Sequence, residues 1–400
     1  MVGKHSRLWL CKDIVEVLEN NGGTGAIEII HLEFPLLKRK EEEDPLKEEK
    51  NEDVEIKWDG TAFKEMKNLK TLIIKNGCFS KGLKYLPNSL RVLEWWRYPS
   101  NSFPYDFQPK ELSILKLPHN LHVSSNLDSL SKKLVTLKIL NLDHIDSLKE
   151  IPDISSLQIL QERSFKECSN LVTVHNSVGF FNKLEILDAE NCPKLSSFPP
   201  VIHLPSLEVL KLNGCSNLEN FPEIAEKIAK LTRLDLRGTG ITYLPYSLCN
   251  LSGLCCLLMW SHEMCNILSV IVMMPELSHC YTWGVGNERW EMGLNGLLTH
   301  SLPSSNITCL FLKNVKLKDD FFLLAVVWFP NVDFLELSGN DFTIIPECIQ
   351  EFRFLWYLNL DNCQSLQEIT GIPPNLKWFS AKNCKLMSPG GSSVLLNQVL

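Results

Sequence analysis

The sequence predicts an α/β solenoid with a parallel β-sheet on its inner side and irregular or short helical segments on its outer side. Three observations predict it: a leucine pattern that recurs at a nearly fixed step, a cysteine or asparagine at a fixed place after it, and an apolar–proline pair that closes the unit. The unit is clearest in Leu207–Pro222, which reads LEVLKLNGCSNLENFP. A fixed period of this length indicates a repeat architecture.

The leucine pattern is LxxLxL, and its first position recurs along most of the chain. The openings are Leu69, Leu90, Leu112, Leu137, Leu160, Leu184, Leu207, Leu231, Leu254, Ile307, Val332, Leu355 and Leu376. They follow one another at steps of 21–25 residues, except for one step of 53. Because such periods are typical of leucine-rich repeats, we expect a leucine-rich-repeat horseshoe of about thirteen repeats.

Each unit is expected to contribute one short strand. In Val209–Asn213 apolar and polar residues alternate, which is the period of a strand with one buried face. Leu210 and Leu212 are expected to point into the solenoid, and Leu207 joins them from the preceding turn. One unit cannot bury this face alone, so stacked neighbours make the core. Pairs such as Phe221-Pro222 belong on the return segments, because proline cannot donate to a ladder.

The ninth position of the unit lies where the strand turns, and its residue must satisfy backbone groups there. Asn120 and Asn340 can do so by hydrogen bonding, and cysteines can fill the same place as small buried residues with a weak S–H donor. These cysteines are Cys168, Cys192, Cys215, Cys363 and Cys384. Because the chain has 14 cysteines but no CxxC pair, we expect reduced core thiols rather than disulfides or metal ligands.

The segment before the first opening does not show the repeat. Arg7–Leu18 has helical spacing and Ala26–Phe34 alternates partly as a strand, so residues 1–35 resemble the tail of a domain. Lys38–Asp53 holds 13 charged residues in 16, and we expect a disordered, solvated loop over 36–57. Trp58–Met66 is expected to form a short helix that covers the first repeat.

The repeat domain is expected to span residues 58–387, with two irregularities. Arg163 takes the place of a core leucine, so its guanidinium should reach the edge or its strand should fray, because an unpaired buried charge is costly. The long step leaves about 29 residues beyond a normal repeat, and we interpret 265–305 as an inserted loop, with a degenerate extra repeat as the alternative. Residues 388–400 are expected to be a truncated tail.

Several phrases resemble plant immune receptors of the TIR–nucleotide-binding–leucine-rich-repeat class. They are W-D-G-T-A-F-K-E-M-K-N-L-K-T-L at Trp58–Leu72, L-P-N-S-L-R-V-L-E-W-W-R-Y-P at Leu86–Pro99, F-K-E-C-S-N-L at Phe165–Leu171 and G-I-P-P-N-L-K-W-F-S-A-K-N-C at Gly371–Cys384. Arg7–Ile30 resembles the segment where the family's nucleotide-binding module gives way to repeats. The resemblance covers nearly the whole chain and implies the leucine-rich-repeat portion only, with residues 1–35 as a remnant of that module.

The chain departs from the family in what it lacks. It has no GxxxxGK[ST] phosphate loop, and it lacks the TIR domain, the methionine-histidine-aspartate motif and the C-terminal β-sandwich. We therefore expect a fragment, a truncated product or a mis-split gene. The family binds ADP or ATP in the missing module, so no cofactor is expected in this chain. The resemblance implies the sensing half: recognition of a pathogen effector or a guarded host protein, and autoinhibition through the receptor's own nucleotide-binding module.

The sequence offers no catalytic or metal-binding constellation at useful spacing, and we expect no enzyme. The net charge is −7 without a basic stripe, which disfavours nucleic-acid binding. No apolar run is long enough to span a bilayer, and no signal segment opens the chain. The cytoplasm is therefore the expected location, with the nucleus as a second compartment. A repeat-only adaptor, such as a ubiquitin-ligase substrate receptor, is the alternative function.

The concave face of the sheet is the expected binding surface. Side chains at the third, fifth and seventh repeat positions should point outward there, since the fourth and sixth point inward. Several of the outward residues are aromatic, the kind that anchors protein partners. The candidate protein-binding residues are Trp96, Trp260, Phe311, Phe334, Tyr357 and Trp378. Stacking between strands, or cover by a missing domain, is the alternative role for these rings.

Overall fold

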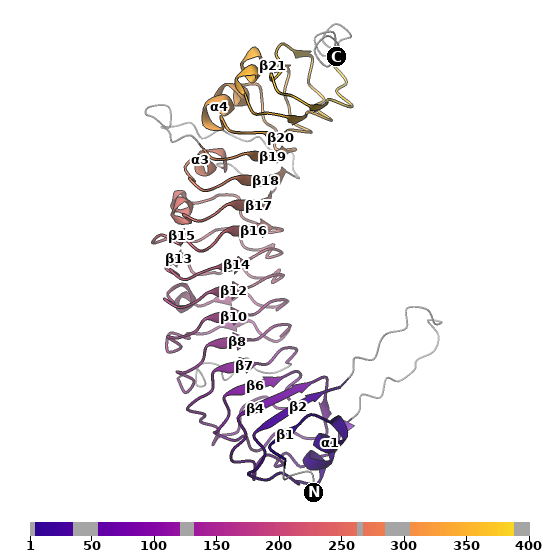
Figure 1. The fold of residues 1–400 in the computed structure, drawn as a ribbon, viewed down its shortest axis with the longest axis vertical. Coiled ribbons are helices and arrows are strands. Elements are labelled where there is room, and N and C mark those ends of the chain that lie inside the picture. The colour runs from indigo at the N-terminus through magenta and orange to yellow at the C-terminus, as the bar shows by residue number, and fades with distance from the viewer. Residues whose placement is uncertain (1–4, 35–54, 121–131, 262–266, 285–304, 388–400) are drawn as a thin grey trace, which may run out of the picture. The chain divides into compact units, whose positions relative to one another are not determined.

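A computed structural model describes residues 5–34, 55–120, 132–261, 267–284 and 305–387. The chain forms two compact units, Met1–Cys192 and Pro193–Leu400. Each unit is a parallel β-solenoid, and Figure 1 shows the strands of each unit in chain order. The fold class expected from the repeats is confirmed. Of the loop expected at 36–57, residues 36–54 lie outside the described residues, and so does the tail expected at 388–400. Residues 55 and 56 form a paired strand, so the loop expectation is wrong there.

The large sheet of the first unit consists of parallel strands that pair in register. They are β1 (Arg7–Leu8), β2 (Ile29–Glu33), β4 (Thr71–Lys75), β6 (Val92–Trp95), β7 (Ile114–Lys116), β8 (Ile139–Asn141), β10 (Glu162–Ser164) and β12 (Ile186–Asp188).

The second unit repeats this arrangement, again with every pairing parallel. Its strands are β14 (Val209–Lys211), β16 (Arg233–Arg237), β17 (Cys256–Ser261), β18 (His279–Gly284), β19 (Cys309–Lys313), β20 (Phe334–Glu336), β22 (Tyr357–Asn359) and β24 (Trp378–Ser380).

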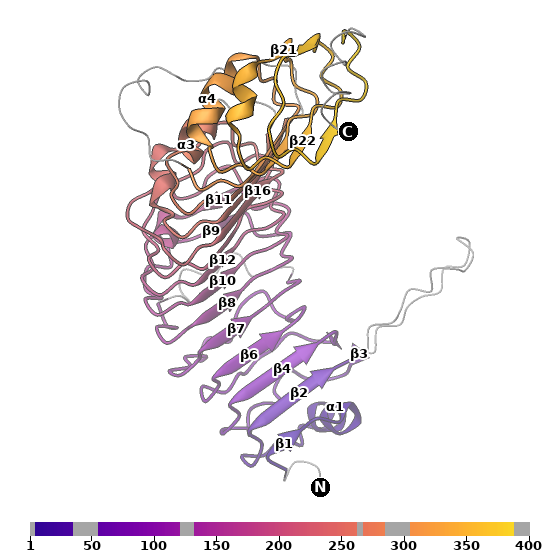
Figure 2. The same cartoon turned by 45° about the horizontal axis from the view of Figure 1, so that its top comes forward.

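The return segments carry short strands that pair in twos, and a few helices. The strand pairs are β3 (Glu55–Ile56) with β5 (Cys78–Phe79), β9 (Glu150–Ile151) with β11 (Thr173–Val174), β13 (Val201–Ile202) with β15 (Glu223–Ile224), and β21 (Ile344–Ile345) with β23 (Glu368–Ile369). The α-helices are α1 (Cys11–Glu19), α3 (Ile267–Ile271) and α4 (Asp320–Trp328), and 3-10 helices span Asn176–Gly179, Tyr246–Asn250 and Glu347–Glu351. Figure 2 shows α3 and α4 in the returns of the second unit, away from its large sheet.

The leucine pattern forms the core as its period requires. Leu207 and Leu212 are fully buried and Leu210 is 2% exposed, whereas Val209 and Lys211 between them are partly exposed. Each strand therefore turns one row of side chains inward and the other onto the opposite side of the sheet. We call that opposite side the open face.

The ninth position satisfies backbone groups as expected at Asn340 but not at Asn120, whose buried amide nitrogen has no hydrogen-bond partner among the described residues. Asn340 is buried; its amide nitrogen donates to the carbonyls of Leu312 and Leu337 at 2.8 and 2.7 Å, and its oxygen accepts from the amides of Val315 and Leu317. Cysteines make the same bond more weakly: the Sγ of Cys168, Cys192 and Cys363 lies 3.2–3.5 Å from a carbonyl of the preceding repeat. The 13 cysteines among the described residues are free, and burial raises the pKa of the Cys168 thiol to about 12.

The residue just before the ninth position has a left-handed backbone in repeat after repeat, which the sequence analysis did not anticipate. Its φ lies between 54° and 79° at Asn76, Arg97, His119, His144, Glu167, Asn191, Gly214, Gly238, Asn314, Gly339, Asn362 and Asn383. Glycine and asparagine tolerate this conformation best. At Arg97, His119, His144 and Glu167 the backbone amide donates to a carbonyl of the following repeat at 2.8–3.2 Å, and these bonds hold the strained turn in place.

The structure contains two repeats that the leucine count omits. Ile27, Ile30 and Leu32 are fully buried, and β2 pairs with β4, so a repeat strand lies within the segment expected to be a domain remnant. Residues 267–284, expected as part of an inserted loop at 265–305, form α3 and β18, and β18 pairs with β17 and β19. For residues 267–284 the inserted-loop interpretation is therefore wrong, and the alternative, a degenerate repeat, is correct. Residues 285–304 lie outside the described residues.

Two local expectations are wrong. Trp58–Met66 makes turns instead of a helix, because the Asp59 carboxylate accepts hydrogen bonds from the Thr61 amide and hydroxyl at 2.8 and 2.6 Å. Such a bond competes with helix formation. Arg163 neither reaches the edge nor frays its strand, since β10 pairs on both sides and Arg163 is 0% exposed. Its guanidinium nitrogens have no hydrogen-bond partner among the described residues, and the group lies 5.7 Å from the ring of Phe165.

Candidate protein-binding surface

Three aromatic residues form one stacked column on the open face of the second unit. Phe334, Tyr357 and Trp378 open β20, β22 and β24 and pair in register. The ring centroids of Phe334 and Tyr357 are 4.0 Å apart with planes at 8°, and those of Tyr357 and Trp378 are 4.1 Å apart with planes at 1°. These distances are shorter than the strand spacing of about 4.8 Å, so the rings lean together. We call these residues the aromatic column.

The column presents apolar surface to solvent. Trp378 is 40% exposed, and Phe334 and Tyr357 are partly exposed. Trp356, which precedes β22 and is 41% exposed, contacts Phe334 at 6.0 Å between ring centroids. Sequence reasoning missed Trp356 because it considered only the third, fifth and seventh positions, and Trp356 holds the second. The exposed rings together offer a contact area of the kind that binds protein partners.

The polar side chains beside the column are held by one another. Asn359 donates to a Glu336 carboxylate oxygen at 2.8 Å and accepts from the Asp361 amide at 2.9 Å. Ser380 donates to the Asp361 carboxylate at 2.5 Å. Burial and the nearby Glu336 carboxylate raise the pKa of Tyr357, so its hydroxyl stays protonated. The network fixes the surface around the rings before any partner arrives.

A second group of rings spans β16 to β19, and sequence reasoning had found only part of it. Trp260 and Trp283 are in register, with ring centroids 6.2 Å apart and planes at 65°. The Arg237 guanidinium lies 5.4 Å from the Trp260 ring and the Lys313 ammonium 4.4 Å from the Trp283 ring. We call Arg237, Trp260, Trp283 and Lys313 the tryptophan–cation row. Trp283 was missed because it lies in the segment expected to be a loop.

The remaining candidates have aromatic neighbours as well. Phe311 on β19 is partly exposed and lies 6.1 Å from Tyr281 between ring centroids, so it adjoins the tryptophan–cation row. Trp96 belongs to the first unit, where its indole N–H donates to Glu94 at 3.0 Å and its ring lies 5.5 Å from that of His119. The second unit therefore brings five of the six predicted residues to one open face, and Trp96 lies in the other unit.

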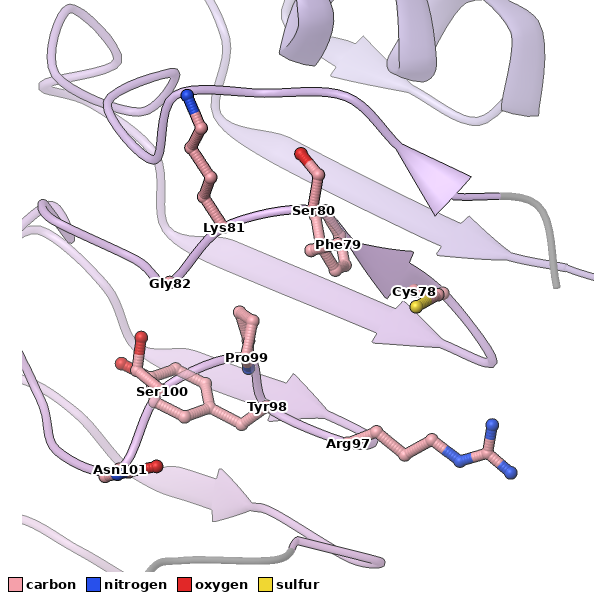
Figure 3. Close-up of a pocket in the computed structure, with 11 residues that line it drawn as sticks. Cys78, Phe79, Ser80, Lys81, Gly82, Arg97, Tyr98, Pro99, Ser100 and Asn101 are labelled. Carbon is pink, nitrogen blue, oxygen red and sulfur yellow. The ribbon is translucent and has the colours of Figure 1, made fainter.

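The first unit also has a cleft of about 370 Å³ between the segments 77–82 and 97–101 (Figure 3). Two of its hydroxyls hold the backbone together: Ser80 accepts from the Trp58 amide at 3.2 Å, and Ser100 accepts from the Leu83 amide at 2.6 Å. Figure 3 shows the side chains of Lys81 and Arg97 extending in different directions, so the two cations do not converge on one point. The cleft is a weaker candidate than the open face.

The described part of the chain has no cluster of metal ligands and no membrane-spanning helix. No three His, Cys, Asp or Glu residues there are grouped to hold a metal ion. None of the helices in the described ranges has the length and apolar character that a bilayer crossing requires.

The sequence of this chain is similar to those of several known proteins. Residues 203–387 match a family model described as "Disease resistance protein RPS4B-like, leucine-rich repeats". The TMV resistance protein N of Nicotiana glutinosa is 27% identical over 94% of this chain and 35% of its own length. Two Arabidopsis thaliana proteins also match: disease resistance protein RPS4B (27% identical over 95% of this chain and 29% of its own length) and disease resistance protein RPP2A (32% over 63% and 18%).

Two of these matches cover nearly all of this chain and the third covers 63% of it, but each covers only about a third or less of the relative. The matching family model describes leucine-rich repeats, in agreement with the leucine pattern and the parallel strands. The chain is therefore similar over nearly all of its length to plant disease resistance proteins of the TIR–NBS–LRR class, and residues 203–387 match their leucine-rich repeats.

Proposed function

We propose that this chain is the protein-recognition, or sensor, region of a plant innate-immune receptor. In this proposal the open face of the second unit binds a pathogen effector or a guarded host protein. The observation that carries it is the aromatic column, in which three rings stack within 4.1 Å and remain partly exposed. Exposed, well-ordered aromatic residues supply much of the binding energy at protein interfaces.

The polar network supports the same proposal. Because Glu336, Asn359 and Asp361 are bonded to one another and to the backbone, the rings beside them lose little freedom on binding. A surface ordered in advance avoids part of the entropic cost of association.

The second part of the proposal concerns the whole receptor. We infer that the repeats also contact a nucleotide-binding module of the full-length receptor and hold it inactive until the partner binds, in the cytoplasm or the nucleus. The relatives support this because each is a disease resistance protein about three or more times as long as the region that this chain matches. This chain would supply binding energy and no catalysis. The relatives do not favour the adaptor alternative.

Exchange of repeats tests the proposal. Ile307–Trp378 is exchanged between two full-length receptors of the class that respond to different effectors, one of them carrying this chain, and cell death in leaves is scored against each effector. Recognition should move with the segment, and Tyr357→Ala should abolish it. Tyr246→Ala, which removes a tyrosine exposed in a return segment, is the matched control. If specificity stays with the recipient, or Tyr357→Ala behaves like Tyr246→Ala, the open face of the second unit is not the recognition surface.

A further inference from the structure

The tryptophan–cation row differs in charge from the rest of the molecule. The chain as a whole has a net charge of −7. On the open face, however, the outward side chains of β16 to β19 include three cations and one carboxylate. The cations are Arg233, Arg237 and Lys313, and the carboxylate is Asp235. The face is therefore locally basic, and its centre is aromatic.

The two cations at the ends of the row are not equivalent. Arg237 makes a two-point ion pair with Asp235, at 2.8 Å from Nε to Oδ1 and 2.6 Å from Nη2 to Oδ2. That bond raises the pKa of Arg237 and neutralises most of its field. Lys313 has no carboxylate within 4.0 Å among the described residues, and its ammonium lies over the Trp283 ring. Lys313 is thus the cation that a partner's carboxylate can use.

The indoles between these cations are open to solvent. Trp260 is 47% exposed and Trp283 is 38% exposed. They meet edge to face, so each leaves apolar surface toward solvent. A partner's apolar side chain that packs on both indoles would lie a few ångströms from Lys313. The Trp283 indole and the partner would then exclude water from an ion pair between Lys313 and a partner carboxylate, which strengthens the pair.

We propose that the tryptophan–cation row binds an acidic peptide segment of the partner, with an apolar side chain on Trp260 and Trp283 and a neighbouring carboxylate paired with Lys313. This rests on the proposed function, because it names the chemistry of the protein that the open face recognises. A single-stranded nucleic acid fits less well, since it needs a continuous positive groove along its backbone, and Asp235 interrupts this one by holding Arg237.

Peptide selection tests the inference. Random peptides displayed on phage are selected against the full chain and counter-selected against the Trp260→Ala/Trp283→Ala variant. The enriched peptides should carry Asp or Glu next to Leu, Phe or Trp. A labelled synthetic copy should bind about tenfold more weakly to Lys313→Glu, and its affinity should fall as salt rises. Lys313→Arg should retain binding, and so should Lys227→Glu, the same charge reversal at an exposed return position.

Four results would overturn the inference: no peptides enriched over the double variant, enriched peptides without acidic residues, equal binding by Lys313→Glu, or tighter binding of a labelled oligouridine than of any peptide. Circular dichroism of each variant separates loss of binding from loss of fold. The readout uses no immune response, so its failure would leave the proposed function standing. Conversely, a positive peptide result would not rescue that function if the repeat exchange failed.

Discussion

The ring of Tyr357 lies parallel to that of Trp378, with centroids 4.1 Å apart and planes 1° apart. Tyr357 makes the same contact with Phe334 on its other side. Each stacked aromatic pair is worth about 0.5–1.5 kcal/mol beyond its buried area. The central ring of the column therefore stabilises three neighbouring repeats at once.

Replacing this ring should weaken the second unit. Tyr357→Ala removes two stacked pairs and should lower the free energy of unfolding by about 1–3 kcal/mol, seen as an earlier urea transition. Tyr246→Ala, at an exposed tyrosine in the 3-10 helix Tyr246–Asn250, should shift the transition by less than about 0.5 kcal/mol. Equal shifts would mean that the stack adds nothing to stability.

Removing the buried charge at Arg163 should stabilise the chain. Its guanidinium is fully buried without a hydrogen-bond partner among the described residues, and burial lowers its pKa to about 10. Arg163→Leu restores the leucine that the repeat pattern expects and should raise the free energy of unfolding by about 3 kcal/mol. Chemical denaturation at neutral pH measures it, with Arg233→Leu at an exposed position of β16 as the control.

The same arginine makes a prediction about alkaline pH. Because the folded state binds its proton less tightly than the unfolded state, the destabilisation is complete below pH 10 and is relieved as pH rises from about 10 toward the higher pKa of the unfolded state. Subtracting the urea midpoints of Arg163→Leu from those of the parent chain, pH by pH, isolates this contribution. The difference should shrink above pH 10, and a constant difference would contradict a charged Arg163.

The ninth-position asparagine should be the most sensitive polar residue in its repeat. Asn340→Ala leaves two amides and two carbonyls without the partner that they share, at a cost of about 2–4 kcal/mol. Asn340→Cys should recover part of this, because Cys363 occupies the same place and donates to the Leu337 carbonyl. Amide hydrogen exchange at Val315 and Leu317 reports the loss directly, and unchanged protection in Asn340→Ala would refute the role.

A pair of stacked histidines predicts acid sensitivity in the first unit. The rings of His119 and His144 are 4.3 Å apart at 13°, and burial together with the charge of His144 lowers the pKa of His119. The folded state thus binds this proton less tightly, so the stability is complete above about pH 6.5 and falls as pH drops below it. His119→Asn, which suits the left-handed φ of 58°, should flatten the dependence of the melting temperature on pH between 7 and 5. A slope equal to the parent's would exclude His119 as its source.

The regular repeats could be predicted because their physics is local. Leu207, Leu210 and Leu212 follow a period that only a stacked strand can bury, and the structure buries them. The repeat at β18 escaped because Cys280 and Thr282 hold the fourth and sixth positions, where the pattern requires leucine. Thr282 is 4% exposed, so packing between two regular neighbours outweighs its polarity.

The binding surface was only partly predictable for a related reason. The outward positions follow from the strand period, so Phe334, Tyr357 and Trp378 could be placed in one column. Trp283 could not be predicted because it lies on a strand that the leucine pattern did not indicate. The pairing of Lys313 with the Trp283 ring follows from the register of the two strands, which only the structure shows. The burial of Arg163 depends on pairing from both sides, which no single repeat encodes.

The left-handed turn before the ninth position has a consequence for how such a protein can change over generations. That site holds arginine, histidine, glutamate, asparagine or glycine in different coils without altering the coil. Backbone hydrogen bonds from this residue to the following repeat hold the bend, and the buried leucines hold the repeats together. Substitutions at this turn can therefore accumulate with little effect on folding, and a lineage can vary it while its scaffold persists.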